Sequence, residues 1–404
     1  LYLKYEADKT IPKKTVAAQD LFGDLLKERA ETGRIYIMNL DHCNSHSSFK
    51  DKVSMSNLCQ EITLPTTPIQ DIHDEQGEIA LCILSAVNVG GLNDLGELEN
   101  ICDLAVRALE QIIDYQDYPV KAAEVSTKKR RSLGIGYIGL AHYLAKHGVK
   151  YSDPKAWDLV DRLSEAFQYH LLRASCNIAM EKGKCEGFER TKYADGLLPI
   201  DHYKKEVDEI VPHKQRMAWE SLRKDIAKYG LRHSTLSAQM PSESSSVVSN
   251  ETNGIEPPRA LLSIKKSKKG PLKQIAPGFP KLKNDYTLLW DMPSNEGYIN
   301  VVAMMQKYFD QAISGNWSYN PTHFDNNEVP LSVMAQDMLT AYKLGWKTSY
   351  YQNTYDFKGD DEDIQPAGLS SVIDTDDGED VELPETAISS GTDIDGEDCD
   401  ACTI

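Results

Sequence analysis

Apolar residues recur every three or four positions in several long stretches of the chain, which is the pattern of helices with one buried face. We expect helices over residues 15–34, 97–116, 154–182, 215–228 and 297–314. The stretch 154–182 carries the clearest end signals, because Asp153 precedes it, Pro154 takes its first position and Gly183 follows its last. The hydrophobic pattern therefore predicts a chain rich in long helices.

Shorter apolar runs between these stretches have the composition of strands. We expect strands over residues 35–40, 79–84, 235–240, 260–264 and 344–351. Strands that alternate with helices are typical of a mainly parallel sheet or barrel, so the predicted fold class is α/β. Without an internal repeat or an interior linker, residues 1–355 are predicted to form one domain.

The charge of the chain lies mainly in its last 49 residues. Residues 356–404 contain seventeen Asp and Glu against one Lys, whereas the formal charge of all 404 residues is -18. This stretch is rich in Asp, Gly, Ser and Thr and poor in aromatic residues, so it cannot bury enough apolar surface to offset its ordering entropy. We therefore expect a flexible acidic tail over 356–404.

The eight cysteines lack the dense, regular spacing of a secreted disulfide scaffold, which favours a reducing, cytoplasmic location. No N-terminal targeting segment is present, and no apolar run reaches the roughly 18 residues of a membrane span. The chain starts at Leu1 in a polar, helix-like stretch, which favours one piece of a split or processed polypeptide.

The run Asn57-Leu58-Cys59-Gln60-Glu61 places an amide, a thiol and a carboxylate at alternate positions. If the run is extended, the three side chains share one face, with a general base beside the thiol. The alternative is a small buried hydrophobic cysteine. That alternative is the default for Cys82, which lies in an apolar stretch.

Cys399 and Cys402 have the spacing of a metal site or of a reversible disulfide. Zinc would need two more ligands, whereas the flanking residues are mainly acidic, so thiol–disulfide exchange is the better interpretation. The acidic surroundings should raise the pKa of both thiols and slow their attack, so an inert tail stays an alternative.

Three further patterns favour structural explanations. The run from Gly134 to Gly139 matches G-x-G-x-x-G, but a basic stretch rather than a strand precedes it, so close helix packing is expected in place of dinucleotide binding. The run from His42 to His46 is expected to be a turn and not a zinc site. Lysines between 265 and 283 are sparsely interleaved with aromatic residues and are expected to form a solvated loop that does not bind nucleic acid.

Two patterns leave functional and structural alternatives open. Hydroxyls and N–H groups after Pro241 could form a phosphate site at a helix N-terminus or a solvated cap; these residues are Ser242, Glu243, Ser244, Ser245 and Ser246. The adjacent phenols Tyr350 and Tyr351 could relay an electron or lie on opposite faces of a strand. Spacing does not choose between them.

These motifs, taken in order together with the run Asn253-Gly254-Ile255-Glu256-Pro257-Pro258-Arg259, resemble the large catalytic subunit of class I ribonucleotide reductase, over nearly the whole chain. The resemblance covers the C-terminal half of that subunit. It implies part of a ten-stranded α/β barrel with the radical cysteine on an inner loop, and reduction of ribonucleoside diphosphates to deoxyribonucleoside diphosphates.

The resemblance also implies a role for each candidate residue. Cys59 would be the thiyl radical and Glu61 would take the 3′-hydroxyl proton. The whole run from Asn57 to Glu61, with Leu58 and Gln60, would bind the substrate. Cys82 would be one of two reducing thiols. Pro241 and Ser242 to Ser245 would hold the phosphates, Tyr350 and Tyr351 would carry the radical, and Cys399 and Cys402 would re-reduce the active site.

The partners follow from the same resemblance. A small subunit with a dimetal–tyrosyl radical would supply the radical, and thioredoxin or glutaredoxin would supply electrons, while this chain would bind no metal or other cofactor. None of Cys43, Cys102, Cys176 and Cys185 matches the second reducing thiol. A separate N-terminal-half polypeptide, which would also bind ATP and deoxynucleotide effectors, is therefore expected.

Two other classes of protein remain as alternatives. A non-catalytic thiol–disulfide exchange or interaction protein would use only the pair Cys399 and Cys402, and would tolerate Cys59→Ser. A nicotinamide-dependent oxidoreductase would rest only on the glycine motif, and failure to bind a dinucleotide would dispose of it.

Overall fold

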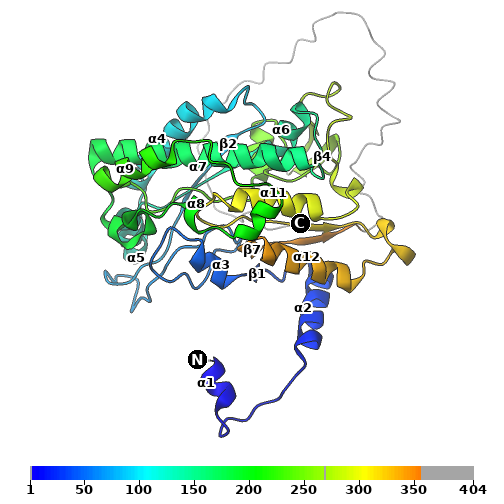
Figure 1. Ribbon diagram of the computed structural model, residues 1–404, viewed down its shortest axis with the longest axis horizontal. Coiled ribbons are helices and arrows are strands. Elements are labelled where there is room, and N and C mark those ends of the chain that lie inside the picture. The colour runs from blue at the N-terminus through cyan, green and yellow to red at the C-terminus, as the bar shows by residue number, and fades with distance from the viewer. Residues whose placement is uncertain (1, 268–269, 356–404) are drawn as a thin grey trace, which may run out of the picture.

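Long helices form one side of the molecule, and extended segments lie beneath them (Figure 1). The structure is a computed structural model that describes residues 2–267 and 270–355. The helices within these ranges are α1 Tyr2–Ala7, α2 Ala18–Thr32, α3 Leu40–Ser45, α4 Leu98–Tyr115, α5 Lys121–Arg130, α6 Leu140–Lys146, α7 Pro154–Lys182, α8 Pro199–His202, α9 Trp219–Tyr229, α10 Glu243–Val248, α11 Glu296–Gln306 and α12 Leu331–Lys343. The strands are β1 Ile37–Met38, β2 Ile83–Asn88, β3 Leu133–Ile138, β4 Leu262–Ser267, β5 Gly270–Ile275, β6 Trp317–Tyr319, β7 Thr348–Ser349 and β8 Gln352–Thr354.

The long helices are where the hydrophobic pattern places them. Helix α7 has the bounds that the sequence predicts, and α4 and α2 lie within theirs. Helix α2 ends at Gly33, whose φ of 69° is costly for other residues. Asp153 does not cap α7, since its carboxylate accepts from the backbone N–H of Lys150 at 2.7 Å. Helix α7 packs against α4, α9 and α11, and this contact carries much of the apolar core.

Parallel extended segments follow one another across the centre of the fold. Strand β2 pairs with β3 in parallel register, and two isolated bridges, Ile135 to Ser237 and Gln239 to Ile313, continue the series. Strands β6 and β8 are also parallel, whereas β1 and β7 are antiparallel. Helices alternating with parallel strands confirm the α/β class. Within the described residues the strands form separate two-stranded sheets and no closed sheet, and the number ten stays a prediction.

Several expected strands are shorter or displaced. The predicted strand 79–84 starts only at Ile83 and runs on to Asn88, and the predicted strand 235–240 is reduced to the two bridges. The predicted strand 35–40 is cut short because α3 starts at Leu40. The predicted strand 344–351 is wrong, because only Thr348–Ser349 is regular and Gln352–Thr354 forms a separate strand.

Two other expectations were also wrong. The helix over 297–314 stops at Gln306, because the Gln306 Nε2 donates to the carbonyls of Phe309 and Gln311 and closes a turn there. The lysine-rich stretch includes the antiparallel hairpin β4–β5 and is not simply a loop. The strand predicted over 260–264 is present in part, because strand β4 of that hairpin begins at Leu262.

The glycine motif is itself strand β3 plus the turn into α6, and helix α5 precedes it. A dinucleotide fingerprint would instead follow a strand. The expected helix packing was wrong: a Cβ on Gly136 would lie 2.6 Å from the carbonyl oxygen of Ala238 in the neighbouring segment. The glycines therefore serve close packing between strands.

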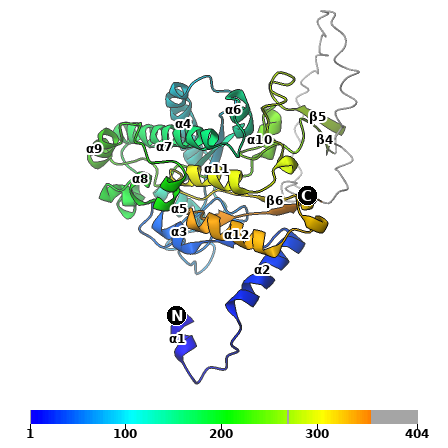
Figure 2. The same ribbon diagram turned by 45° about the vertical axis from the view of Figure 1, so that its right-hand side comes forward.

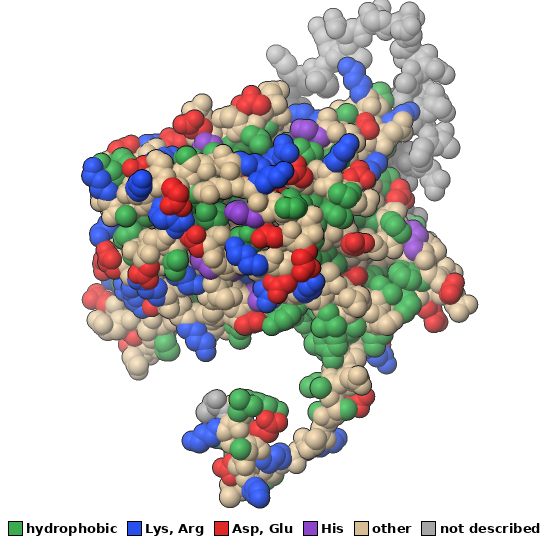
Figure 3. Space-filling model, in the orientation of Figure 1, with side chains coloured by type: hydrophobic (Ala, Val, Ile, Leu, Met, Phe, Trp, Pro, Cys, Tyr) green, Lys and Arg blue, Asp and Glu red, His purple; other side chains and the backbone are tan. Residues whose placement is uncertain are grey.

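Helix α1 lies apart from the rest of the molecule at the end of an extended segment (Figures 1 and 2), and none of its residues is buried. Hydrophobic side chains gather on the surface where α2 meets α12 (Figure 3). They include the exposed side chains of Leu21, Leu331 and Leu339. Within residues 2–267 and 270–355, every helix is either too short or too polar to cross a bilayer.

Candidate active site

Cys59 lies in a turn and not in an extended strand. The backbone N–H of Gln60 donates to the carbonyl of Asn57 at 3.2 Å, and Gln60 has a φ of 70°. The expected single face shared by Asn57, Cys59 and Glu61 is therefore wrong. The turn is closed at its base because the backbone N–H of Ile62 donates to Asn57 Oδ1 at 3.0 Å. The turn still keeps the side chain of Asn57 within hydrogen-bonding reach of Glu61.

The carboxylate of Glu61 is buried beneath this turn, with 2% of the residue exposed. Burial raises the pKa of Glu61, and hydrogen bonds from Asn57 and Ser314 oppose that shift. The Ser314 Oγ is 3.2 Å from Glu61 Oε2 and also donates to the backbone carbonyl of Cys59. A carboxylate with a raised pKa in a dry setting is suited to accept a proton from a bound substrate.

Tyr350 connects the thiol to a cluster of phenols. Its Oη is 3.6 Å from Cys59 Sγ, and its ring lies 4.0 Å from that of Tyr351, centroid to centroid. Tyr36 completes the cluster, with ring centroids 4.7 Å from Tyr350 and 5.6 Å from Tyr351. Burial raises the pKa of Tyr36 to about 12 and also raises that of Tyr350. The arrangement favours the relay alternative over a strand with one ring on each face.

Cys82 lies just before β2 and is half-buried. Its Sγ is 3.6 Å from Nε2 of Gln311, the only side-chain donor that the described residues offer to it. Burial raises the pKa of the Cys82 thiol, and the nearby carboxylates of Glu61 and Asp310 add to that shift. The sulfur packs against a small apolar cluster of Phe49, Ile62, Leu64 and Ala238. Cys82 is thus kept as a neutral thiol. It packs on the same apolar cluster as Ile62, which lies at the base of the Cys59 turn.

The serine-rich run lies at the start of helix α10, which fits both a phosphate site and a solvated cap. Ser242 stands at the N-cap position and is buried, and its Oγ donates to the carbonyl of Met240 at 3.1 Å. The side chains that follow, Glu243, Ser244 and Ser245, are exposed, as is Pro241. The first N–H groups of a helix lack intrahelical partners. Exposed hydroxyls beside them leave the phosphate-binding alternative open.

The remaining residues of the catalytic run have modest contacts. Leu58 is 60% exposed, and the Nε2 of Gln60 donates to Ser56 Oγ at 2.8 Å. His42 and Cys43 belong to helix α3, which replaces the expected turn. Within the ranges that the structure covers, no group of three His, Cys, Asp or Glu side chains could hold a metal ion. Cys399 and Cys402 lie outside the described residues.

Sequence reasoning missed Tyr36, Gln311 and Ser314. Tyr36 was assigned to a strand, and no local pattern indicates a partner more than 300 positions away. Gln311 and Ser314 were hidden inside the helix wrongly predicted over 297–314. A correct helix end at Gln306 would have exposed both as polar residues on an extended segment.

Comparison with known proteins agrees with this geometry. Residues 1–352 match the family described as ribonucleotide reductase, barrel domain. The chain is 57% identical to the ribonucleoside-diphosphate reductase subunit alpha of Buchnera aphidicola subsp. Baizongia pistaciae over 370 residues, which cover 90% of this chain and 49% of that protein. It is also 57% identical over 359 residues to the subunit alpha of Haemophilus influenzae, with 88% and 48% covered. The ribonucleoside-diphosphate reductase 1 subunit alpha of Escherichia coli K12 is 54% identical over 379 residues, with 92% and 50% covered. The chain spans about half the length of these relatives.

Proposed function

The chain belongs to the ribonucleotide reductase barrel-domain family, and on that premise we propose that it is the catalytic portion of a ribonucleoside-diphosphate reductase. The reaction would convert a ribonucleoside diphosphate and two thiols into a 2′-deoxyribonucleoside diphosphate, one disulfide and water, for DNA synthesis. The observation that carries the proposal is the 3.6 Å contact between Tyr350 Oη and Cys59 Sγ above a buried carboxylate.

The first steps use the residues of the Cys59 turn. A radical on Tyr350 takes the hydrogen atom of the Cys59 thiol, which leaves a phenol and a thiyl radical. The thiyl radical removes the 3′ hydrogen of the substrate. Glu61 takes the 3′-hydroxyl proton, which its raised pKa favours. Asn57 lies within hydrogen-bonding reach of Glu61 and would orient the same hydroxyl.

The reduction itself needs two thiols and a leaving water. Cys82 supplies one thiol, whose raised pKa keeps the proton on sulfur until it is transferred to the departing 2′ hydroxyl. The 3′ hydrogen returns from Cys59 to the sugar at the end of the cycle. Pro241 and Ser242 to Ser245 would hold the diphosphate through the exposed hydroxyls and N–H groups at the start of α10.

The proposal takes the other thiol from an N-terminal-half chain. Cys43, Cys102, Cys176 and Cys185 are all buried in the core, each with at most 2% of its surface exposed, which is typical of a packed structural cysteine. We therefore include an N-terminal-half chain in the proposal, which completes the barrel and carries ATP and deoxynucleotide effector sites. A small subunit with a dimetal–tyrosyl radical would pass the radical to Tyr351 and Tyr350. Thioredoxin or glutaredoxin would restore the thiols through Cys399 and Cys402.

The proposal is tested by deoxynucleotide formation from a ribonucleoside diphosphate. This chain, the N-terminal-half chain, the small subunit and the reductant are mixed, and each is omitted in turn. Activity should require the complete mixture and should be lost in Cys59→Ser but kept in Cys43→Ser, a matched change at a buried cysteine outside the site. Full activity without the N-terminal-half chain would refute the split-subunit part. Inactivity of the complete mixture, with exchange activity intact in Cys59→Ser, would favour the thiol–disulfide alternative.

A further inference from the structure

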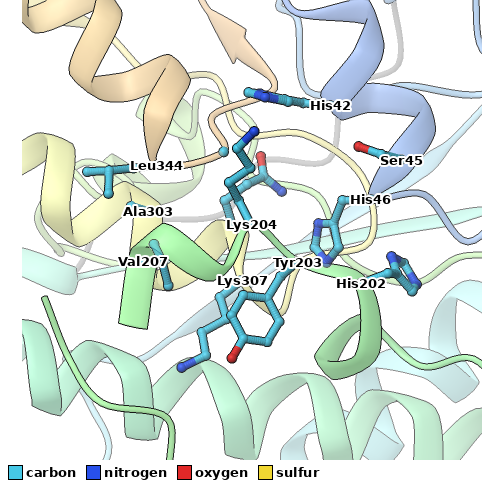
Figure 4. A pocket seen from close by; sticks show the side chains of 12 residues that line it. His42, Ser45, His46, His202, Tyr203, Lys204, Val207, Ala303, Lys307 and Leu344 are labelled. Atoms are coloured by element: carbon cyan, nitrogen blue, oxygen red, sulfur yellow. The ribbon is translucent and has the colours of Figure 1, made fainter. Parts of the chain in front are cut away.

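A polar cavity of about 250 Å³ lies between α3, α8, α11 and the end of α12, away from the candidate active site. Its lining includes no carboxylate. The polar and charged side chains that line it are His42, Ser45, His46, His202, Tyr203, Lys204, Gln306 and Lys307. Figure 4 shows the imidazoles of His46 and His202 side by side, with Lys204 above them and Tyr203 below. A polar cavity of this size holds several waters or a small ligand.

Two imidazole nitrogens in this lining have no hydrogen-bond partner among the described residues. They are Nε2 of His42 and Nδ1 of His202. The Nδ1 of His42 is 2.8 Å from the carbonyl of Trp346, and a carbonyl can only accept, so Nδ1 carries the proton. The Nε2 of His42 faces the carboxylate of Asp41, whose Oδ2 is 3.8 Å away. His202 bonds the backbone of Ser45 in the same way, which leaves its Nδ1 as an acceptor.

The two lysines of the lining differ in their surroundings. The amine of Lys307 turns out of the cavity to Asp161, at 3.1 Å, and to Asp208, at 3.4 Å (Figure 4). Lys204 has no ion-pair partner among residues 2–267 and 270–355, and its amine points toward His42. Burial together with the nearby Lys192 and Lys347 lowers the pKa of His202 to about 4, so the ring stays neutral at pH 7.

An occupant of this cavity has to accept from a lysine and donate to the Nδ1 of His202. A hydrogen phosphate does both, because its charged oxygens accept and its P–OH group donates. Sulfate carries no proton at pH 7 and can only accept. A metal ion is disfavoured beside an uncompensated lysine, and no three-ligand group exists within the ranges the structure covers. We propose that this cavity is a binding site for a protonated phosphate group, free or carried on a small molecule.

The site is independent of the proposed substrate loop, since no residue of α10 lines it. Two residues nevertheless connect it to the reducing thiol. Gln306 lines the cavity and donates to the carbonyl of Gln311, whose amide contacts Cys82. An occupant of the cavity therefore touches the turn that positions Gln311.

Calorimetry and histidine NMR on the full 404-residue chain test the proposal, with inorganic phosphate, sulfate and a nucleoside monophosphate as probes. Phosphate should bind at least about tenfold more tightly than sulfate at pH 7 and should shift the imidazole signals of His46 and His202. Tighter binding of the nucleoside monophosphate would identify a carried phosphate, and equal or weaker binding would identify the free ion as the ligand.

Matched lysine variants locate the binding. Lys204→Met should weaken phosphate binding about tenfold or more and abolish the histidine shifts. Lys205→Met should change neither, because Lys205 lies over the Tyr203 ring at 3.5 Å and does not line the cavity. The proposal is overturned if phosphate and sulfate bind equally, if phosphate leaves the histidine signals unchanged, or if Ser244→Ala rather than Lys204→Met removes binding. The last result would place phosphate at α10 and leave the proposed function intact.

Discussion

A substitution at Gly134 tests how closely β2 and β3 pack beside the thiol of Cys82. A Cβ at this glycine would lie 2.6 Å from Leu84 Cδ2, 2.9 Å from Cys82 Sγ and 3.3 Å from Ala238 Cβ. Non-bonded carbon atoms prefer separations of about 3.5–4.0 Å, so Gly134→Ala requires the neighbours to move by roughly 1 Å. Leu84 is 42% exposed and can turn away, whereas Cys82 is held between Gln311 and the apolar cluster beneath it.

The expected cost of Gly134→Ala is about 1–3 kcal/mol of unfolding free energy, the range of an overpacked core position. Urea unfolding should report that loss, and alkylation of the displaced Cys82 should be faster than in the wild type. Gly23→Ala is the matched control, because its Cβ would meet only Leu331 Cδ2 at 3.7 Å within helix α2. That control should gain about 0.5–1 kcal/mol. If Gly134→Ala is as stable as the wild type and Cys82 is alkylated at the same rate, the close packing deduced here is wrong.

Three further outcomes are expected. Ser314→Ala removes a donor that Glu61 shares, so the pKa of Glu61 should rise further above its ordinary value; carboxyl infrared titration measures it, and an unchanged pKa would contradict the assigned bond. Tyr350→Phe should keep the fold, since the ring still packs, yet reduce deoxynucleotide formation in the complete mixture to background. Burial alone would raise the pKa of Glu110, but bonds from His233 and two arginines hold it at about 2, and burial lowers the pKa of His233. Both groups bind protons more weakly in the folded chain, so stability should fall as pH drops from about 6.5 to 2, with up to about 3 kcal/mol from Glu110 below pH 4.5; a Glu110→Gln chain that loses stability just as steeply below pH 4.5 would refute this.

The sequence was a good guide to structure wherever the deciding signal is local. Helix α7 could be predicted to the residue because its apolar period, Pro154 and Gly183 all lie within the helix or beside it. The end of α11 could not, because apolar residues continue past Gln306 and the helix stops through contacts made elsewhere. The amine of Lys347 donates to the carbonyls of Phe309, Asp310 and Gln311, and no pattern around residue 306 indicates that distant lysine.

The same distinction holds for the candidate site. Cys59 and Glu61 could be recognised as candidate site residues from their spacing in the sequence. The adjacent tyrosines could be recognised in the same way. The backbone conformation that brings them together could not, because a left-handed residue at Gln60 has no sequence signal of the kind that glycine or asparagine provides. The contact of Tyr36 with Tyr350 could not be predicted for a related reason. Aromatic contacts across more than 300 residues depend on the completed fold.

One extended segment, residues 311–316, contacts Cys82, the Cys59 turn with Glu61, and the pair Tyr350 and Tyr351. Its first side chain contacts Cys82, its second backbone N–H donates to the carbonyl of Glu61 at 3.0 Å, and Ser314 binds the Cys59 turn. Its last two residues accept from the backbone N–H groups of Tyr350 at 2.8 Å and Tyr351 at 3.0 Å. The thiol, the carboxylate and the phenols all contact the same short segment. Their separations therefore depend on one element rather than on four independent loops. A radical relay needs that property, since a change of about 1 Å between donor and acceptor atoms is enough to slow a transfer step by orders of magnitude.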